Sequence, residues 1–434
     1  MGALALAVVM VGGTLWLRPW ERNFEAASEQ RMAFPLPDKP SVAVLPFDNL
    51  SGDPEKEHFA DGLTENIIST LSRVPTMFVI ARNSTFTYKG RPVKVQEVAE
   101  NLGVRYVLEG SVRIADDRVR VTAQLIDAIA GTHIWSEQYD RDYGDLFALH
   151  DDITREIVTA LQVELTDGEQ ARVWSALTDS PEAGNHMMKG VEKFYRFNKE
   201  DNLLARAEME RAVDADPYFA LGYTLLAWTH WADASYGWTD LPERSLTRAV
   251  LFAGKAMALN PDIPDVYALR GAIHLYRREF ADAIAAGEKA LELNPNHATN
   301  AALLALTLVN TGRAADALAM IRTAMRLSPY YPAWFVGILA DAYYGLGEYE
   351  QSAAVLLGLM ERPDDTNAIC RCRVGIALAY AALGREDEAR DQITLLRAED
   401  PQFTISQLLT SNLHRDTTAV ERRAAVLKRL GLPE

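Results

Sequence analysis

The sequence predicts a small α/β domain with a mixed sheet, followed by an all-α superhelix of repeated hairpins and preceded by one N-terminal transmembrane helix. Three observations support this prediction. Residues 2–17 carry no charge. Residues 118–125 (RVRVTAQL) alternate between polar and apolar side chains, which is typical of a strand with one solvated face. Four prolines are spaced by 34 residues through helix-forming sequence: Pro261, Pro295, Pro329 and Pro363.

The composition is that of a globular protein with an acidic surface. The chain has 434 residues, which is room for two to four domains, and 48% of them are hydrophobic and 24% charged. The net charge of −16 argues against a nucleic-acid partner, because such a partner requires a basic face that neutralises phosphates. It also argues against an anionic membrane surface as the main partner of the soluble part.

Residues 1–20 form the predicted transmembrane anchor. The uncharged stretch is slightly shorter than the roughly 20 residues that a spanning helix needs, unless the helix continues to Trp20. Trp16 and Trp20, with the nearby Arg18 and Arg22, suit a membrane–water interface. A secretory signal remains the alternative, although no basic region precedes the apolar run and no small-residue cleavage site closely follows it. Residues 21–40 are the predicted juxtamembrane spacer and end in PLPDKP, which favours a stiff, extended connector.

Residues 41–165 form the predicted α/β domain. Apolar and alternating runs indicate strands at 41–46, 78–81, 106–114, 118–127 and 133–139, and helical spacing indicates helices at 59–71, 95–102 and 146–165. Glu109 lies inside an otherwise apolar strand, and we expect it to pair with Arg105 or Arg113.

Six sequence blocks in this region resemble a known family. They are VAVLPFD (42–48), FADGLTE (59–65), VIARNS (79–84), VRYVLEGSVR (104–113), AQLID (123–127) and HIWSEQYDR (133–141). In this order they resemble the TolB amino-terminal-like domain of bacterial envelope proteins. The resemblance implies a periplasmic domain between a membrane helix and tetratricopeptide repeats. In many related chains a class III adenylate/guanylate cyclase domain precedes the membrane helix, and this sequence looks like such a protein without its cyclase half.

The sequence predicts no catalytic residue, cofactor or metal site. The stretch 51–54 (SGDP) lies between a strand and a helix, where phosphates are often held, but it lacks a glycine-rich phosphate-binding pattern. We therefore interpret Ser51 and Asp53 as turn and capping residues. The run 150–152 (HDD) resembles a metal or acid/base cluster, but adjacent helical residues diverge, so we interpret it as part of a solvated helix.

Residues 184–400 form the predicted repeat array, which follows a linker at 166–183 and ends in a capping helix region at 401–434. A period of 34 residues in a helix–turn–helix pattern is the tetratricopeptide signature, and it indicates about six hairpins. Small residues occupy the positions where helices cross closely, as in Gly271, Ala283 and Ala290. Such arrays usually hold a protein or peptide in a concave groove. Because the linker is polar, we expect the two soluble units to fold separately.

Two groups of residues are candidates for contact with a partner. Trp228, Trp231, Tyr236 and Trp238 lie close together in a lengthened hairpin, either buried against its neighbour or forming an aromatic rim. Tyr276, Asn310 and Tyr344 are predicted to face the groove. The groove-facing positions lack the lysine, asparagine and arginine set with which some repeats of this family hold a C-terminal carboxylate.

These observations predict a non-catalytic scaffold or sensor module that is anchored in the inner membrane and binds a protein or peptide partner. The alternative is the regulatory C-terminal portion of an adenylate/guanylate cyclase system whose catalytic domain is not on this chain. In either case we expect no cyclase activity from this chain alone.

The sequence also predicts the orientation of the soluble part, although two arguments disagree. Arg18 and Arg22 would remain in the cytoplasm by charge bias, whereas the TolB-like resemblance implies a periplasmic domain. We give more weight to the resemblance, because Glu21, Glu25 and Glu29 nearly balance the charge of the spacer. A fusion of alkaline phosphatase after Glu434 should therefore be active. An inactive phosphatase fusion together with a bright cytoplasmic fluorescent fusion would reverse the orientation.

Overall fold

The computed structural model describes residues 26–116, 118–142, 146–163, 178, 180–362, 366–410 and 413–434. The predicted anchor at 1–20 and most of the predicted linker at 166–183 lie outside the described residues. Within the described part, none of the helices combines the length and the apolar character that crossing a membrane requires.

The α/β domain is built on a mixed sheet. Its strands lie in the order β3 (Phe78–Val79), β1 (Ser41–Val44), β4 (Tyr106–Ala115), β5 (Arg118–Asp127) and β6 (Thr132–Asp142), and the short β2 (Asp48–Asn49) also pairs with β4. β1 runs parallel to β3 and β4, whereas β4, β5 and β6 form an antiparallel meander. The predicted strands are present, and β5 alternates between exposed and buried residues over its first half as the sequence indicates.

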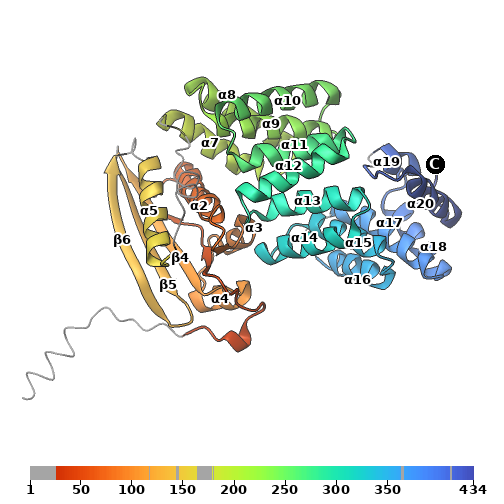
Figure 1. Ribbon diagram of the computed structural model, residues 1–434, viewed down its shortest axis with the longest axis horizontal. Coiled ribbons are helices and arrows are strands. Elements are labelled where there is room, and N and C mark those ends of the chain that lie inside the picture. Colours follow the sequence, from red (N-terminus) through yellow and green to blue (C-terminus); the bar gives the residue numbers. More distant parts are fainter. Residues whose placement is uncertain are drawn as a thin grey trace, which may run out of the picture.

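Helices cover both faces of this sheet (Figure 1). Val42 and Val44 pack in the same cluster as α2 (Glu57–Ser72) and α5 (Leu146–Ala160). Ala43, between them, points to the opposite face, which α4 (Val95–Leu102) covers. The remaining elements of the domain are α3 (Arg82–Thr85) and the 3-10 helices η1 (Glu29–Arg31), η2 (Pro54–Lys56) and η3 (Phe86–Tyr88).

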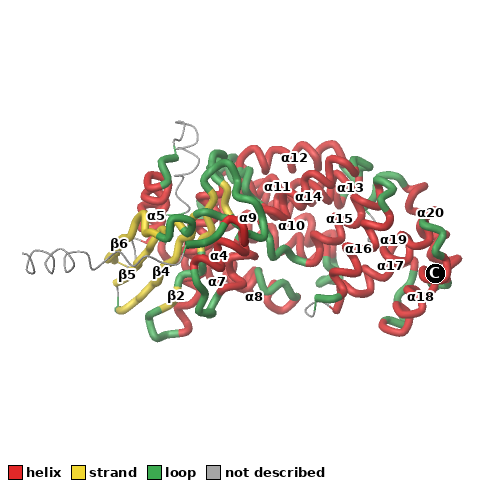
Figure 2. Tube along the Cα trace, turned by 90° about the horizontal axis from the view of Figure 1, so that it is seen from below, coloured by secondary structure: helices red, strands yellow, loops and turns green. Residues whose placement is uncertain are grey.

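The rest of the described chain is helical, and it extends away from the sheet towards the C-terminus (Figures 1 and 2). Consecutive helices pair as α7 (Pro181–Phe194) with α8 (Lys199–Ala215), α9 (Ala220–Ser235) with α10 (Pro242–Leu259), α11 (Pro264–Tyr276) with α12 (Phe280–Leu293), α13 (Ala298–Asn310) with α14 (Ala314–Leu327), α15 (Ala333–Gly345) with α16 (Tyr349–Met360), and α17 (Thr366–Ala382) with α18 (Glu386–Glu399). The helices α19 (Ile405–Thr410) and α20 (Thr417–Leu430) follow.

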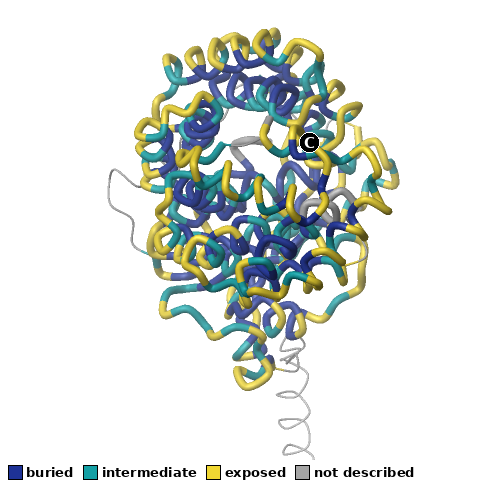
Figure 3. The backbone as a smooth tube through the Cα atoms, turned by 90° about the vertical axis from the view of Figure 1, so that its right-hand side faces the viewer, coloured by how far each residue is buried: buried dark blue, intermediate teal, exposed yellow. Residues whose placement is uncertain are grey.

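Small residues allow the paired helices to approach closely. A Cβ atom on Gly271 would lie 3.2 Å from the main-chain oxygen of Ala283, which belongs to the second helix of the same hairpin. Ala283 and Ala290 are fully buried, and so are the matching Ala317 and Ala324 one repeat later. In Figure 3 the buried residues lie where helices pack on each other, and exposed residues follow the outer turns. The predicted small-residue positions are therefore core positions.

The α/β domain and the array share one hydrophobic core. A single cluster of buried residues runs from the sheet through α2 into helices α7 to α11. At its centre Gly62 of α2 lies against Met188 of α7, so closely that a Cβ atom on Gly62 would lie 2.4 Å from the Met188 Cγ and Sδ atoms. Beside this contact, the hydroxyl of Tyr195 donates to Glu65 Oε1 at 3.2 Å. This shared core argues against the expectation that the two units fold separately.

The loops that carry the periodic prolines also contact the α/β domain. Beside Pro295, the side-chain amide of Asn294 donates to Ser72 Oγ at 2.9 Å, and that of Asn296 lies 3.1 Å from the main-chain oxygens of both Ser72 and Val74. Both asparagines are buried. The domain therefore receives hydrogen bonds from a turn that, in the sequence, looks like an ordinary inter-repeat connection.

The next proline-bearing loop makes equivalent contacts 34 residues later. The main-chain N–H of Ala81 donates to the Leu327 oxygen at 2.8 Å, and the Tyr330 N–H donates to Ser84 Oγ at 2.8 Å. The hydroxyls of Ser84 and Ser328 are 3.2 Å apart, and both residues are fully buried. The α/β domain therefore docks against two successive loops of the array.

Arg326 completes this interface. Its guanidinium donates to the main-chain oxygens of Leu102 and Gly103, at 3.1 and 2.8 Å, and it lies 4.5 Å from the centre of the Phe78 ring. Burial in this position lowers the Arg326 pKa to about 10. Gly103 ends α4 in a left-handed conformation (φ +63°), and a side chain there would meet both Arg326 and the main chain of Phe34.

The ion pair expected for Glu109 is not formed. Arg105 instead pairs with Asp127 at 2.8 Å, and Glu109 lies opposite Gln124 in the β4–β5 ladder. Burial raises the Glu109 pKa, as does the nearby Asp48 carboxylate. The register explains the difference, because Asp127 lies opposite Tyr106, next to Arg105, whereas Glu109 is four residues, or about 13 Å, farther along the strand.

We expect the shared core to make the two units unfold together. Gly62→Ala should lower the stability of the whole chain by about 1–3 kcal/mol, because the new methyl group clashes with Met188. Gly254→Ala is the matched control: it is also within a helix but faces open space, so it should stabilise by about 0.5–1 kcal/mol. Urea unfolding followed by circular dichroism measures both. Two separate unfolding transitions would contradict the shared core, if the one with the larger change in circular dichroism keeps its midpoint in Gly62→Ala.

Candidate functional site

The N-terminal and C-terminal ends of the first helices in the central hairpins have different surroundings. Their N-terminal ends follow the proline-bearing loops, and these loops hold the α/β domain. Three of the predicted groove residues lie at or near the opposite, C-terminal ends: Tyr276 on α11, Asn310 on α13 and Tyr344 on α15. They are spaced by 34 residues and so occupy one equivalent position in successive repeats. The candidate site therefore lies about 18 Å along these helices from the α/β interface.

The four predicted aromatic residues form one cluster at the corresponding end of α9. The Trp228 and Trp231 rings are 5.2 Å apart, Trp231 and Tyr236 are 5.9 Å apart, and Tyr236 stacks on Trp238 at 5.4 Å. The sequence analysis missed a fifth member, Phe197, whose ring lies 4.8 Å from Tyr236. Phe197 lies in the turn between α7 and α8, more than 30 residues before the other members, and only the folded hairpin brings it to them.

This aromatic cluster is partly packed and partly open to solvent. Trp228 and Trp231 are half-buried and pack against the main core, whereas Phe197 and Tyr236 are 50% and 49% exposed. Aromatic groups with one packed face and one open face are typical of contact surfaces. Trp228 and Trp231 are therefore packed against the core, whereas a rim for partner contact at the exposed rings stays a prediction.

A buried polar network holds α9 in place beneath these rings. Asp233 accepts hydrogen bonds from Asn202 at 2.8 Å and from Arg206 at 2.7 Å, both on α8. Asn202 also donates to the main-chain oxygen of Thr229 at 2.9 Å. Because charged hydrogen bonds of this kind are strong when buried, the last turn of α9 is fixed relative to the preceding hairpin.

His230 lies within the same turn and is buried. Its ring stacks on Phe252 at 5.6 Å, and neither ring nitrogen has a hydrogen-bond partner among the described residues. Burial, with the positive charges of Arg206 and Arg248, lowers the His230 pKa to about 3. His230 is therefore a neutral packing residue rather than an acid/base group at neutral pH.

Asn310 and Tyr344 are in contact with the chain's own C-terminal region. The main-chain carbonyl oxygen of Asn310 accepts a hydrogen bond from the Arg415 main-chain N–H at 2.7 Å. The Arg423 guanidinium lies 4.5 Å from the centre of the Tyr344 ring. Tyr276 is half-buried at the equivalent position of α11.

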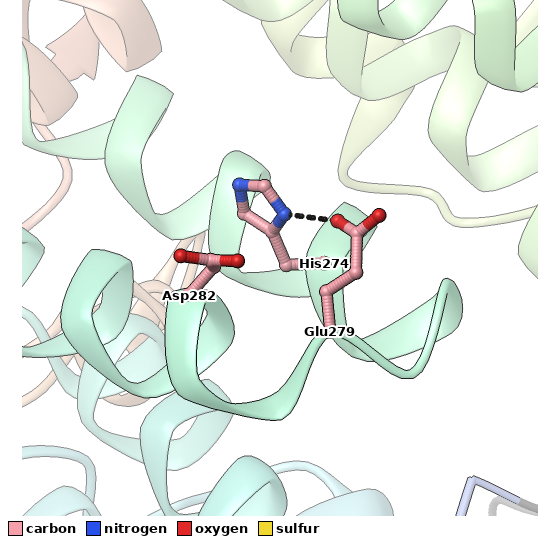
Figure 4. A group of neighbouring side chains, drawn as sticks. All are labelled: His274, Glu279 and Asp282. Carbon is pink, nitrogen blue, oxygen red and sulfur yellow. Dashed lines mark hydrogen bonds and ion pairs between the residues drawn. The ribbon is translucent and has the colours of Figure 1, made fainter.

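One group of side chains among the described residues has the composition of a metal site. Ligand atoms of His274, Glu279 and Asp282 lie within 4.8 Å of one another at the turn between α11 and α12 (Figure 4). Two of the three side chains are exposed, and His274 Nδ1 is already 2.5 Å from Glu279 Oε2. The Glu279 N–H also donates to the His274 oxygen, so these contacts close the turn, and we assign the group a structural role.

The residues that resembled chemical motifs have structural roles. Asp53 caps η2 by accepting from the Glu55 N–H, and Ser51 Oγ accepts from the Ile114 N–H. His150 does not lie on a solvated face as expected. It is buried, with its Nε2 atom 3.2 Å from Thr70 Oγ1 and its Nδ1 atom 2.9 Å from Asp151. It therefore joins α5 to α2.

Two segments of the chain match known protein families. Residues 264–297, which span α11 and α12, match the tetratricopeptide repeat. The chain carries tetratricopeptide repeats. Residues 38–156 match the second domain of HilA/YgeH-like transcriptional regulators. This match covers the α/β domain and differs from the TolB-like family that the sequence blocks resemble.

The chain is also similar to a curated bacterial protein. It is 44% identical over 244 residues to putative adenylate cyclase 3 of Rhizobium meliloti (strain 1021), and the match covers 56% of this chain. The match covers 42% of that relative, so the chain spans less than half of its length.

Solved structures of helical repeat proteins are similar at low identity. A thermophilic TPR protein of Thermus thermophilus is 17% identical with a TM-score of 0.37, over 45% of this chain and 98% of that chain. The pilF protein of Pseudomonas aeruginosa is 18% identical with a TM-score of 0.39, over 51% of this chain and 93% of that chain. These values do not support any argument about function.

The lowered pKa of His230 predicts an acid-dependent loss of stability. The unfolded chain takes up a proton near pH 6.5, whereas the folded chain does so only near pH 3. The stability is therefore complete above pH 6.5 and falls as the pH drops from 6.5 towards 3, by at most about 1.4 kcal/mol per pH unit from this one group.

His230→Phe should make the fall in stability with decreasing pH less steep, because phenylalanine keeps the stacking on Phe252 but takes up no proton. Urea midpoints measured between pH 7 and 4 test it. The control is His133→Phe on the exposed edge strand β6, which should leave the slope unchanged. An equal slope in the wild-type chain and His230→Phe would show that His230 is not the responsible group.

Proposed function

We propose that this chain is a non-catalytic interaction module that binds a protein or peptide partner at the C-terminal ends of the first helices of its repeats. The observation that carries the proposal is the aromatic cluster, with the open rings of Phe197 and Tyr236. The cluster is separate from the two proline-bearing loops that dock the α/β domain, although the turn that carries Phe197 also carries Tyr195, which donates to Glu65 of α2. Aromatic side chains supply large contact areas at low entropic cost, which suits them to anchor a partner.

The α/β domain has a supporting role in this proposal. It occupies the loop edge of the central hairpins and buries polar main-chain groups there, as the Asn296 and Arg326 contacts illustrate. A partner therefore meets the other helix ends, around Tyr276 and the aromatic cluster. We further propose that the chain is anchored in the inner membrane by residues 1–20, with this surface in the periplasm, as the TolB-like resemblance implies.

A second candidate function is the regulation of a nucleotide cyclase. The 44% identity to putative adenylate cyclase 3 favours this candidate, because that relative is named as a cyclase. In this case the partner of the array is a cyclase catalytic domain, either on a longer form of this chain or on another chain. The two candidates share the same binding surface and differ in the identity of the partner.

Site-specific photo-crosslinking tests the surface and separates the two candidates. A crosslinking amino acid in place of Tyr276 or Phe197 should capture a protein from membranes. The same residue in place of Glu288, which is exposed on the second helix α12, should capture none. A captured cyclase domain supports the second candidate, and any other protein supports the first.

Equal capture from all three positions would contradict the proposed surface. Formation of cyclic AMP or cyclic GMP by the purified chain would contradict its non-catalytic character.

A further inference from the structure

The C-terminal end of the array is occupied by part of the chain itself. We refer to residues 413–423 as the C-terminal segment; it includes the first half of α20. This segment crosses the ends of three successive hairpins. Arg278, after α11, donates to the His414 main-chain oxygen at 2.7 Å, and the Arg415 N–H donates to the Asn310 oxygen at 2.7 Å. Farther along, Arg423 lies over the Tyr344 ring.

The array contacts the C-terminal segment as it would contact a separate peptide. The main-chain oxygen of His414 and the main-chain N–H of Arg415, which precede α20, are both bonded to the array, and these contacts do not use their side chains. The side-chain contact is Arg423 of α20 over an aromatic ring, a favourable cation–π pair. The two types of contact together define a site for a peptide that is bound through its backbone at a non-helical start and through an arginine on the helix that follows.

The charges around this site agree with a basic occupant. Asp341 lies one turn before Tyr344 on α15. The Asp341 side chain is exposed on α15. Desolvation by neighbouring groups raises its pKa, and the positive charges of Arg423 and His414 act in the opposite direction. These cations are favourable neighbours for the carboxylate.

The start of the C-terminal segment is exposed, whereas the end of α20 has buried residues. Arg415, Asp416 and Thr417 are exposed, and a cavity of about 370 Å³ lies between this stretch and Thr311 and Gly312. The other end of α20 is anchored separately: Leu427 and Leu430 are buried, and Arg429 pairs with Glu386 at 2.6 Å. The segment and the C-terminal half of α20 are therefore held by different contacts.

We propose that Arg278, Asn310, Asp341 and Tyr344 form a binding site for an arginine-containing peptide, and that the C-terminal segment occupies this site until such a peptide replaces it. The inference rests on the proposed function, because it concerns partner binding by the array. It adds the chemistry of the partner and an intramolecular competitor. Because a tethered segment has a high effective concentration, it can exclude a free peptide of equal intrinsic affinity.

The test uses a fluorescein-labelled synthetic peptide with the sequence of residues 413–424 and the full-length chain. Fluorescence anisotropy should show weak binding to the wild-type chain. Arg423→Glu in the chain weakens the intramolecular contact with Tyr344 and Asp341, so the peptide should bind about tenfold more tightly. Lys428→Glu is the matched control: it reverses a charge on the same helix, but Lys428 is exposed and pairs with Glu434 rather than with the array, so it should leave the affinity unchanged.

Two results would overturn the inference. One is equal peptide affinity for the wild-type, Arg423→Glu and Lys428→Glu chains. The other is that Tyr344→Ala, added to Arg423→Glu, leaves peptide binding as tight as before while circular dichroism shows an intact fold.

Hydrogen exchange of residues 413–423 in the wild-type chain provides a second measurement. Exchange there should become faster when excess peptide is added, and unchanged exchange at saturating peptide counts against the inference. The synthetic peptide needs no natural partner. Failure of the crosslinking experiment and failure of this one are therefore distinguishable.

Discussion

Asn296 places its side-chain amide between two main-chain oxygens of the α/β domain, and this buried contact determines how the rest of the chain can be used. Ser72 is the last residue of α2, where helix carbonyls have no partner within the helix, whereas the Val74 oxygen lies in the following turn and also accepts from the Met77 N–H at 3.2 Å. An unsatisfied buried polar group costs about 1–3 kcal/mol. The array therefore completes α2, and the α/β domain in turn covers a loop of the array that would otherwise expose buried asparagines.

This constraint assigns different roles to the two ends of the repeat helices. Because the loops before α13 and α15 hold the α/β domain, these ends are not open to another partner. The opposite ends carry Tyr276, Asn310, Tyr344 and the aromatic cluster. There the chain shows both kinds of contact that a peptide partner needs, since the rings of Phe197 and Tyr236 are open and the C-terminal segment is bonded through its backbone.

Local patterns predicted the elements and their repetition. The period of two in residues 118–125 corresponds to β5, and the spacing of the prolines corresponds to the hairpins, because both patterns follow from the geometry of one strand or one helix pair. The close packing at Gly271, Ala283 and Ala290 was predicted for the same reason.

Contacts between distant segments could not be predicted in this way. Asn294 and Asn296 flank a proline and look like turn residues, yet their partners lie 222 or more residues earlier. His150 appeared to belong to a solvated helix because its local neighbours are acidic, whereas α2 covers it. Phe197 lies far from the other members in the sequence and joins the aromatic cluster only through the fold. Each of these contacts depends on how two elements dock, which leaves no periodic signal in the sequence.

The two ends of the central helices are physically linked by the packing between them. α13 and α15 contact each other, and each is a short rigid rod of 13 residues. At the start of these rods lie the loops that bond Ser72, Val74 and Ser84, and at their ends lie the contacts of Arg415 and Arg423. Small buried residues leave little space for independent movement of the neighbouring helices. A change in the angle between α13 and α15 at one end therefore also changes it at the other, so the state of the C-terminal segment and the docking of the α/β domain depend on the same two helices.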